Sequence, residues 1–233
     1  MSATPRAVVL VSGEGSNLQA IIDQVRRGAL GLTLAGVVSD RPGVRALERA
    51  AAAGIAAHMV DHASDPPAFP GRLAAILTEL QPDLVILAGF MRILPSELVD
   101  EYRGRMLNVH PSLLPKYPGL HTYRRALEAG DREHGSTVHF VIPALDAGPG
   151  IIQYRVPVHP GDTEASLRER VRAGEHLIYP RAIAWLAAGR VTLRDGAAWL
   201  DGERLTQPVV VDEARGAGAS VAESPRPDIV CRQ

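Results

Sequence analysis

Short, continuous apolar runs alternate with amphipathic segments from residue 7 onward, and this alternation constrains the fold more than any other feature of the sequence. The first run, Ala7–Val11, is rich in valine, as expected for a strand buried on both faces of a parallel sheet. Further strands are predicted at 34–38, 58–60, 84–87 and 106–109. Helical spacing separates them, as at Leu73, Ile76, Leu77 and Leu80, which share one helix face. The alternation predicts an α/β fold with a doubly wound, mostly parallel sheet and helices on both faces.

The second half of the chain has a different pattern. Residues 136–142 and 150–158 form longer, partly alternating runs, which suit an antiparallel extension of the sheet. Two helices are expected at 164–171 and 176–188, with Pro180 as a kink or a late start of the second.

The C-terminal region is predicted to be only partly folded. Two Asp-Gly pairs, at 195–196 and 201–202, predict small hairpins between residues 191 and 205. We expect a single domain over 1–211, with a phosphate-binding N-terminal half and a catalytic C-terminal half. Residues 212–233 are rich in Ala, Gly, Ser and Pro and lack an apolar period, so a disordered tail is predicted there.

Charge and composition argue against several classes of protein. The net charge of the 233 residues is −1 and no basic run is present, which speaks against a nucleic-acid partner. No apolar run reaches the length of a membrane span, and no signal peptide is recognisable. The single cysteine, Cys231, fits a reducing compartment. These features predict a soluble, cytoplasmic protein. Lys116 is the only lysine, and it lies in the loop with the densest motifs.

A glycine-rich turn, Ser12 to Leu18, joins the first predicted strand to a helix. The start of a helix offers free N–H groups and a positive dipole end, which suit a phosphate. Ser16 and Asn17 can cap the helix and donate to phosphate oxygens. Leu18 stands where a dinucleotide fingerprint has its third glycine, so a single phosphate ester is favoured over a pyrophosphate. The alternative is an ordinary strand-to-helix turn.

A second group of polar residues suits acyl transfer. Asn108 and His110 lie two apart at the end of a predicted strand, so their side chains point to the same side. An amide and a protonated imidazole can stabilise the oxyanion of a tetrahedral intermediate, and the imidazole can also move protons. Asp146, in the turn Leu145-Asp146-Ala147-Gly148-Pro149, could face His110 and favour its protonated form. The alternatives are a structural histidine and an aspartate that bonds its own backbone.

Four motifs in this order identify a family that the chain is similar to. They are Ser12-Gly13 with Gly15-Ser16-Asn17-Leu18, Ala88 to Leu94, Asn108 to Pro115, and Leu145-Asp146 followed by Gly148-Pro149. Together they resemble the phosphoribosylglycinamide formyltransferase family, over about Ala7 to Leu205. The resemblance implies a Rossmann-like formyltransferase fold. It also implies transfer of a formyl group from 10-formyltetrahydrofolate, the co-substrate, to the amine of glycinamide ribonucleotide in de novo purine (IMP) synthesis, with no metal.

The resemblance assigns roles to single positions. The catalytic residues are Asn108, His110 and Asp146. The residues that hold the phosphate and the ribonucleotide are Gly15, Ser16, Asn17 and Glu175. The folate-binding residues are Met91, Arg92, Ile93, Leu94, Asn108, Ile142, Pro143, Ala144, Leu145 and Asp146. His139 has either a supporting role, orienting the site or the substrate, or a structural one. For the apolar positions core packing is the alternative.

Two positions depart from the family pattern. Glu14 stands where relatives commonly have Asn, and a carboxylate beside a phosphate is unfavourable, so we expect its side chain to point to solvent. Pro66 stands near the place where relatives often have an arginine that reaches the folate tail. Whether Arg72 replaces that arginine is left open.

Three other functions remain as alternatives. A formyltetrahydrofolate hydrolase has the same scaffold, but usually with an extra N-terminal domain. A methionyl-tRNA formyltransferase would need a further RNA-binding domain and a basic face. A non-catalytic phospho-sugar binding protein would keep the phosphate turn and would not need Asn108, His110 and Asp146. The sequence does not distinguish a monomer from a homodimer.

Overall fold

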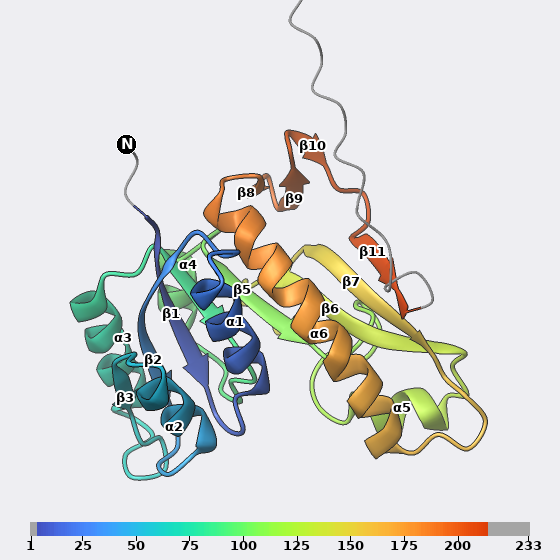
Figure 1. Ribbon diagram of the computed structural model, residues 1–233, viewed down its shortest axis with the longest axis horizontal. Coiled ribbons are helices and arrows are strands. Elements are labelled where there is room, and N and C mark those ends of the chain that lie inside the picture. Colours follow the sequence, from blue (N-terminus) through green and yellow to red (C-terminus); the bar gives the residue numbers. More distant parts are fainter. Residues whose placement is uncertain (1–3, 214–233) are drawn as a thin grey trace, which may run out of the picture.

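The computed structural model describes residues 4–213, which form an α/β arrangement of a central sheet between helices (Figure 1). The strands are β1 (Arg6–Val11), β2 (Thr33–Ser39), β3 (Ala57–Met59), β4 (Leu84–Leu87), β5 (Met106–His110), β6 (Glu133–Phe140), β7 (Gly150–Pro157), β8 (Val191–Arg194), β9 (Ala197–Leu200), β10 (Glu203–Arg204) and β11 (Val209–Asp212). The helices are α1 (Ser16–Arg26), α2 (Arg45–Ala52), α3 (Phe69–Leu80), α4 (Ser96–Glu101), α5 (Thr122–Glu128) and α6 (Glu164–Ala187).

The large sheet has the strand order β11-β7-β6-β5-β4-β1-β2-β3. Strands β1 to β5 pair in parallel, and β6 and β7 extend the sheet in antiparallel fashion. The chain leaves β1 toward β2 and β3 and then returns to β4 on the other side of β1. Ligands of open α/β sheets bind beyond the carboxyl ends of the strands at such a reversal. The predicted doubly wound, mostly parallel sheet is confirmed.

Alternate residues of β1 belong to two hydrophobic clusters on opposite faces of the sheet. Val9 and Val11 pack with the apolar sides of α1, α2 and α6, whereas Val8 and Leu10 pack with α3 and α4. Residues 7–11 are fully buried, as the continuous apolar run predicted. Because helices cover both faces of the sheet, polar groups of the strands can contact a ligand only at the strand ends.

Helix α6 corrects one prediction, because it is a single helix of 24 residues and not two helices (Figure 1). It starts at a capping box in which Ser166 N–H donates to Thr163 Oγ1 and Thr163 N–H donates to Ser166 Oγ. Gly174, which lies between the two predicted helices, contacts the Tyr154 ring with no room for a Cβ. This glycine serves the packing of α6 on β7. Pro180 lies inside the helix.

Near the C-terminal end of the described residues, the predicted hairpins are present, but one strand there was not predicted. Asp195-Gly196 and Asp201-Gly202 have positive φ in the β8–β9 and β9–β10 turns, so the predicted hairpins are confirmed. The short edge strand β11 and the helix α4 were not predicted. Residue 212 ends β11, and residues 214–233 of the predicted tail lie outside the described residues. Within residues 4–213, no helix is long and apolar enough to cross a membrane.

Candidate active site

Four segments from different parts of the chain meet at the carboxyl ends of β1, β4 and β5. They are the turn after β1, residues 88–94 after β4, the end of β5 and the loop after β6. Ser12 Oγ accepts a hydrogen bond of 2.8 Å from Met91 N–H and so joins the first two segments. A cleft of about 610 Å³ opens between residues 89–93, 108–111, 119–123, 145–146 and α6. Asn108, His110 and Asp146 all line this cleft.

His110 lies at the end of β5 with a hydrogen-bond acceptor at each ring nitrogen. Its Nε2 is 2.9 Å from the carbonyl oxygen of Tyr117, and its Nδ1 is 3.4 Å from Oδ2 of Asp146. A carbonyl oxygen can only accept, so Nε2 carries a proton. In the neutral ring, Nδ1 would then turn a lone pair toward a carboxylate. The geometry therefore favours the imidazolium, in which Nδ1–H faces Asp146.

The Asp146 carboxylate is buried and is directed away from its own turn. Its Oδ2 accepts a 2.8 Å hydrogen bond from Gly119 N–H, and this same oxygen faces His110. Asp146 has a φ of +49°, a conformation that Asp tolerates better than most residues. The sequence alternative, an aspartate that bonds its own backbone, is not what the structure contains.

His139 orients the amide of Asn108. The Nδ1 of His139 is 2.9 Å from the carbonyl oxygen of Phe140, so Nδ1 carries the proton and Nε2 can only accept. Asn108 Nδ2 lies 3.2 Å from that Nε2 and donates to it. Burial lowers the pKa of His139 and keeps the ring neutral. The 3.9 Å approach of His139 to Asp146 is therefore not an ion pair.

All positions predicted to bind folate except Met91 line a small cavity that adjoins the main cleft, and Met91 lines the cleft itself. This cavity, of about 90 Å³, is lined by residues 142–146 and by Arg92, Ile93, Leu94, Asn108 and His139, among others. Leu94 is buried, but Met91, Ile93 and Leu145 are 55%, 75% and 55% exposed. Core packing does not account for these three side chains, and they remain free to contact a ligand.

Arg92 forms an ion pair with a buried carboxylate. Its Nε donates a 2.6 Å hydrogen bond to Oδ2 of Asp40, whose side chain is fully buried at the end of β2. This ion pair fixes the position of the guanidinium beside the cleft. Arg72 donates to the carbonyl oxygens of Asp61 and Asp65 on the surface.

The glycine-rich turn differs from the prediction in its cap. Gly15 is the N-cap residue in a left-handed conformation (φ +74°), and neither Ser16 nor Asn17 caps the helix with its side chain. A Cβ on Gly15 would lie 2.7 Å from that of Ala46, so close packing on α2 also requires glycine. Asn17 Nδ2 instead donates a 2.8 Å hydrogen bond to Oε2 of Glu175 on α6. The predicted phosphate and ribonucleotide positions therefore lie side by side.

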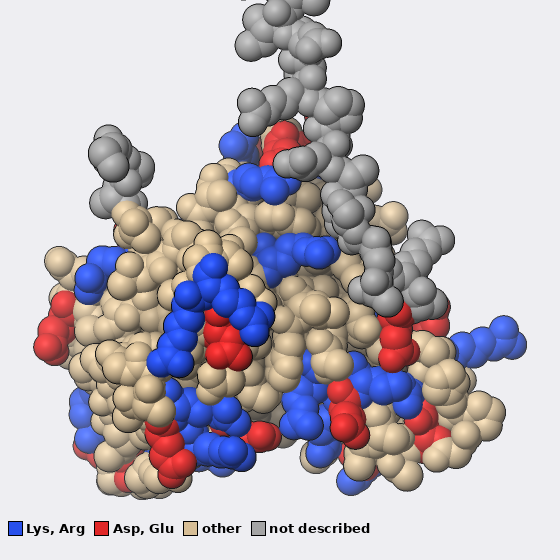
Figure 2. All heavy atoms as spheres, viewed as in Figure 1, with Lys and Arg blue, Asp and Glu red and all other residues tan. Residues whose placement is uncertain are grey.

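Two arginines surround Glu14. Its carboxylate is 53% exposed, in agreement with the expected direction, and lies 3.7 Å from Arg49 of α2 and 3.4 Å from Arg172 of α6. Figure 2 shows Lys and Arg side chains gathered along the lower edge of this face, near α1, α2 and the start of α6. The two cations offset the carboxylate that the turn carries.

Glu175 is buried, and desolvation raises its pKa to about 7 from a usual 4.5, although the Asn17 hydrogen bond acts in the opposite direction. The folded carboxyl stays protonated at pH values where the unfolded one has ionised, so its contribution to stability is lost as pH rises from about 4.5 to 7. We expect Glu175→Gln to nearly match the wild type near pH 4.5 and to be about 3 kcal/mol more stable at pH 8. Urea unfolding at both pH values measures this.

The control for this variant is Glu203→Gln, at an exposed position of β10. Its stability relative to the wild type is expected to be the same at both pH values. A pH-independent difference for Glu175→Gln would contradict the raised pKa.

Several lining residues were not predicted. Glu164 and Arg168 of α6 line the cleft, and Asp40 holds Arg92. Asp40 lies two residues after a predicted strand, and this position near a strand end was the available signal. Tyr117 and Gly119 act through backbone groups, for which side-chain motifs give no signal. Among residues 4–213, no group of three or more His, Cys, Asp or Glu side chains is placed to hold a metal ion.

Comparisons with known proteins agree with this geometry. A family model described as formyl transferase matches residues 5–183. The chain is 52% identical over 200 residues to the phosphoribosylglycinamide formyltransferase of Escherichia coli K12, covering 85% of this chain and 94% of that protein. The crystal structure of the Coxiella burnetii phosphoribosylglycinamide formyltransferase superimposes with a TM-score of 0.84 at 44% identity, covering 89% of this chain and all of that one.

A more distant structural relative is a formyltetrahydrofolate deformylase from Pseudomonas syringae. It superimposes with a TM-score of 0.80 at 27% identity, and the match covers 85% of this chain and 66% of the deformylase. The sheet and its helices are therefore shared with a protein described as a deformylase.

Proposed function

The chain belongs to the formyl transferase family, and on this basis we propose that it transfers the formyl group of 10-formyltetrahydrofolate to the amine of N1-(5-phosphoribosyl)glycinamide, a step of IMP synthesis. The observation that carries this proposal is the arrangement of His110, Asp146 and Asn108 in one cleft. Among residues 4–213, no cysteine, serine or lysine lines this cleft. In this proposal the nucleophile is the amine of the ribonucleotide.

His110 is the electrostatic centre of the proposed mechanism. When the amine attacks the formyl carbon, negative charge develops on the formyl oxygen, and the imidazolium and the Asn108 amide stabilise it. The Nδ1 edge is the one that can turn to the oxyanion, because its 3.4 Å contact with Asp146 is longer than the 2.9 Å contact of Nε2 with Tyr117. As the bond from carbon to N10 breaks, the proton lost by the amine passes to N10 through His110 or water.

Asp146 and His139 prepare these groups in the proposed mechanism. Asp146 keeps His110 charged and aimed into the cleft. His139 accepts one Asn108 N–H, and the second N–H and the carbonyl oxygen of Asn108 are left for the substrates. Both supports are buried, so their electrostatic effect on the reacting atoms is screened little by solvent.

The ribonucleotide side of the site is the turn after β1. Backbone N–H groups at the start of α1, together with Ser16 and Asn17, would hold the phosphate. Arg49 and Arg172 leave this turn with a positive balance despite Glu14. Glu175, one of the groups closest to Asn17, would contact the sugar of the ribonucleotide.

The folate side is the small cavity and the exposed apolar residues beside it. We expect Ile93→Asn to raise the KM for 10-formyltetrahydrofolate about fivefold, because the ligand covers part of this 75% exposed side chain. The KM for the ribonucleotide and the melting temperature should stay unchanged. The matched control is Leu177→Asn on α6, which removes a 53% exposed apolar side chain outside the cleft. Equal folate KM values in both variants would contradict the assignment.

The test of the proposed function is a folate absorbance assay with 10-formyltetrahydrofolate, run with and without the ribonucleotide. Release of deformylated folate that requires the ribonucleotide is expected. Release without it would identify a hydrolase, and saturable binding without turnover would identify a binding protein. The cytoplasmic location and the choice between monomer and homodimer stay predictions, as does the absence of nucleic-acid and membrane partners.

A further inference from the structure

A single loop segment, Tyr117 to Gly119, touches both members of the His110–Asp146 pair. The Tyr117 carbonyl accepts from His110 Nε2 at 2.9 Å, and Gly119 N–H donates to Asp146 Oδ2 at 2.8 Å. The orientation of the imidazole in the cleft therefore depends on the position of this backbone. A shift of the Tyr117 carbonyl would free the Nε2 edge and let the ring rotate away from Asp146.

The Tyr117 backbone is in a conformation that needs support. Its φ of +56° is in the left-handed region, which is unfavourable for a residue with a bulky side chain. Such a conformation persists only where surrounding contacts hold it. The carbonyl of the preceding residue, Lys116, is held by Ser112 Oγ at 2.6 Å, and that of Pro118 by Arg125 Nη1 at 2.6 Å.

The Tyr117 side chain supplies the remaining support. Its hydroxyl donates a 2.9 Å hydrogen bond to Oδ2 of Asp131, and the Arg125 guanidinium lies 5.0 Å from the ring centroid. Asp131 is held in turn by Lys116, whose Nζ lies 2.8 and 2.9 Å from its two carboxylate oxygens. The Asp131 side chain is 15% exposed, whereas Lys116 is 58% exposed. The only lysine of the chain thus completes this cluster.

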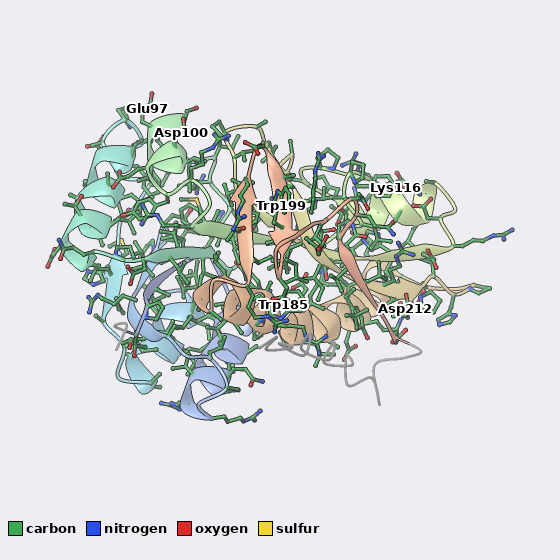
Figure 3. All side chains as sticks on the ribbon, turned by 90° about the horizontal axis from the view of Figure 1, so that it is seen from above. Glu97, Asp100, Lys116, Trp185, Trp199 and Asp212 are labelled. Carbon is green, nitrogen blue, oxygen red and sulfur yellow. The ribbon has the colours of Figure 1, made fainter. Side chains whose placement is uncertain are left out.

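We propose that Tyr117, Asp131 and Lys116 form a positioning cluster that fixes the Tyr117 carbonyl and, through it, the imidazolium of His110. None of the three side chains needs to touch a substrate. They act on the orientation of His110, and the proposal rests on the transferase function given above. Figure 3 places Lys116 at the same end of the molecule as α5, opposite Glu97 and Asp100.

Tyr117→Phe tests the cluster by removing only the hydroxyl. We expect kcat to fall about fivefold, the effect of one hydrogen bond, with the KM for the ribonucleotide within twofold of the wild type. Asp131→Ala, which removes the acceptor of the Tyr117 hydroxyl, should lower kcat by a similar factor. The double variant should resemble either single variant, because both changes break the same contact. Lys116→Gln should lower kcat by less than about threefold, as expected for an exposed ion pair, and Lys116→Arg should restore it.

The matched control is Arg103→Gln. It breaks an ion pair of 3.3 Å to Asp100, and Arg103 is 57% exposed, close to the value for Lys116. This variant should keep the wild-type kcat. The proposal is overturned if Tyr117→Phe keeps the wild-type kcat, or if the effects of the two single changes add in the double variant. It is also overturned if the loss of kcat across the variants is proportional to their loss of melting temperature.

A second measurement separates this proposal from the transferase function. The ring ¹⁵N resonances of His110 report its hydrogen bonds without turnover. We expect the Nε2 signal to move in Tyr117→Phe and in Lys116→Gln, but not in Arg103→Gln. If the wild type fails to transfer formyl groups but these shifts occur, the function is wrong and the positioning cluster stands. Unmoved signals in a functional enzyme would refute the cluster alone.

Discussion

Replacement of His110 by alanine is expected to lower kcat by about three orders of magnitude. The imidazolium supplies both the charge opposite the developing oxyanion and the route for a proton, and each is worth about a hundredfold or more. Because the ring touches Asp146 and Tyr117 and not the phosphate turn, the KM for the ribonucleotide should change less than about threefold. Steady-state kinetics with both substrates varied measures this.

The control for this variant is His159→Ala, at an exposed histidine in the loop before α6. It should keep wild-type kinetics. Wild-type turnover in His110→Ala would remove this residue from the mechanism. A rise in KM with unchanged kcat would instead indicate a residue that binds substrate and transition state equally.

The second large effect is expected for Asp146→Asn, with kcat lowered about a hundredfold. An asparagine oxygen can still accept from Gly119 N–H, so the turn is preserved. The charge that favours the His110 imidazolium is lost, and Nδ1 then faces a neutral amide. The melting temperature and the ribonucleotide KM should change little, as thermal unfolding and kinetics can measure.

The His110→Ala/Asp146→Asn double variant tests whether Asp146 acts through His110. If Asp146 acts through His110, the double variant should be hardly slower than His110→Ala alone, because groups that act as a unit are not additive. Asp100→Asn, at an exposed acid of α4, is the control for the substitution itself. Multiplicative losses in the double variant would show that Asp146 acts independently of His110.

Much of the fold follows from local patterns in the sequence. Continuous apolar runs marked the strands β1, β2, β4 and β5, since a strand covered on both faces needs no polar side. The two Asp-Gly pairs marked the hairpins, because their backbone conformation is a local property. The break predicted between residues 171 and 176 was wrong. Gly174 lies in this stretch of α6 and packs against the Tyr154 ring of β7. Glycine has a low helix propensity, and only the tertiary contact explains it.

Some features of the candidate site were likewise predictable from neighbouring residues, whereas others depend on contacts between distant segments. Asn108 and His110 share a side because they lie two apart on a strand, and this needs no further knowledge. The approach of Asp146 to His110 was a hypothesis, and the structure places them 3.4 Å apart. The support from Tyr117 and Gly119 could not be predicted, because it depends on backbone groups of a loop with a positive φ. The caps expected at Ser16 and Asn17 were wrong, because Asn17 bonds Glu175 instead.

Helix α6 carries groups of three kinds along its length. Glu164 and Arg168 line the cleft, Arg172 and Glu175 reach the turn after β1, and the buried Tyr179 hydroxyl lies within hydrogen-bond distance of the Leu87 and Leu107 carbonyls. One inserted residue would rotate everything beyond it by about 100°. Insertions and deletions between Thr163 and Tyr179 should therefore abolish function, whereas those in the hairpins after Ala187 should be tolerated. In a library of single-codon insertions, this helix should be the longest uninterrupted stretch without survivors.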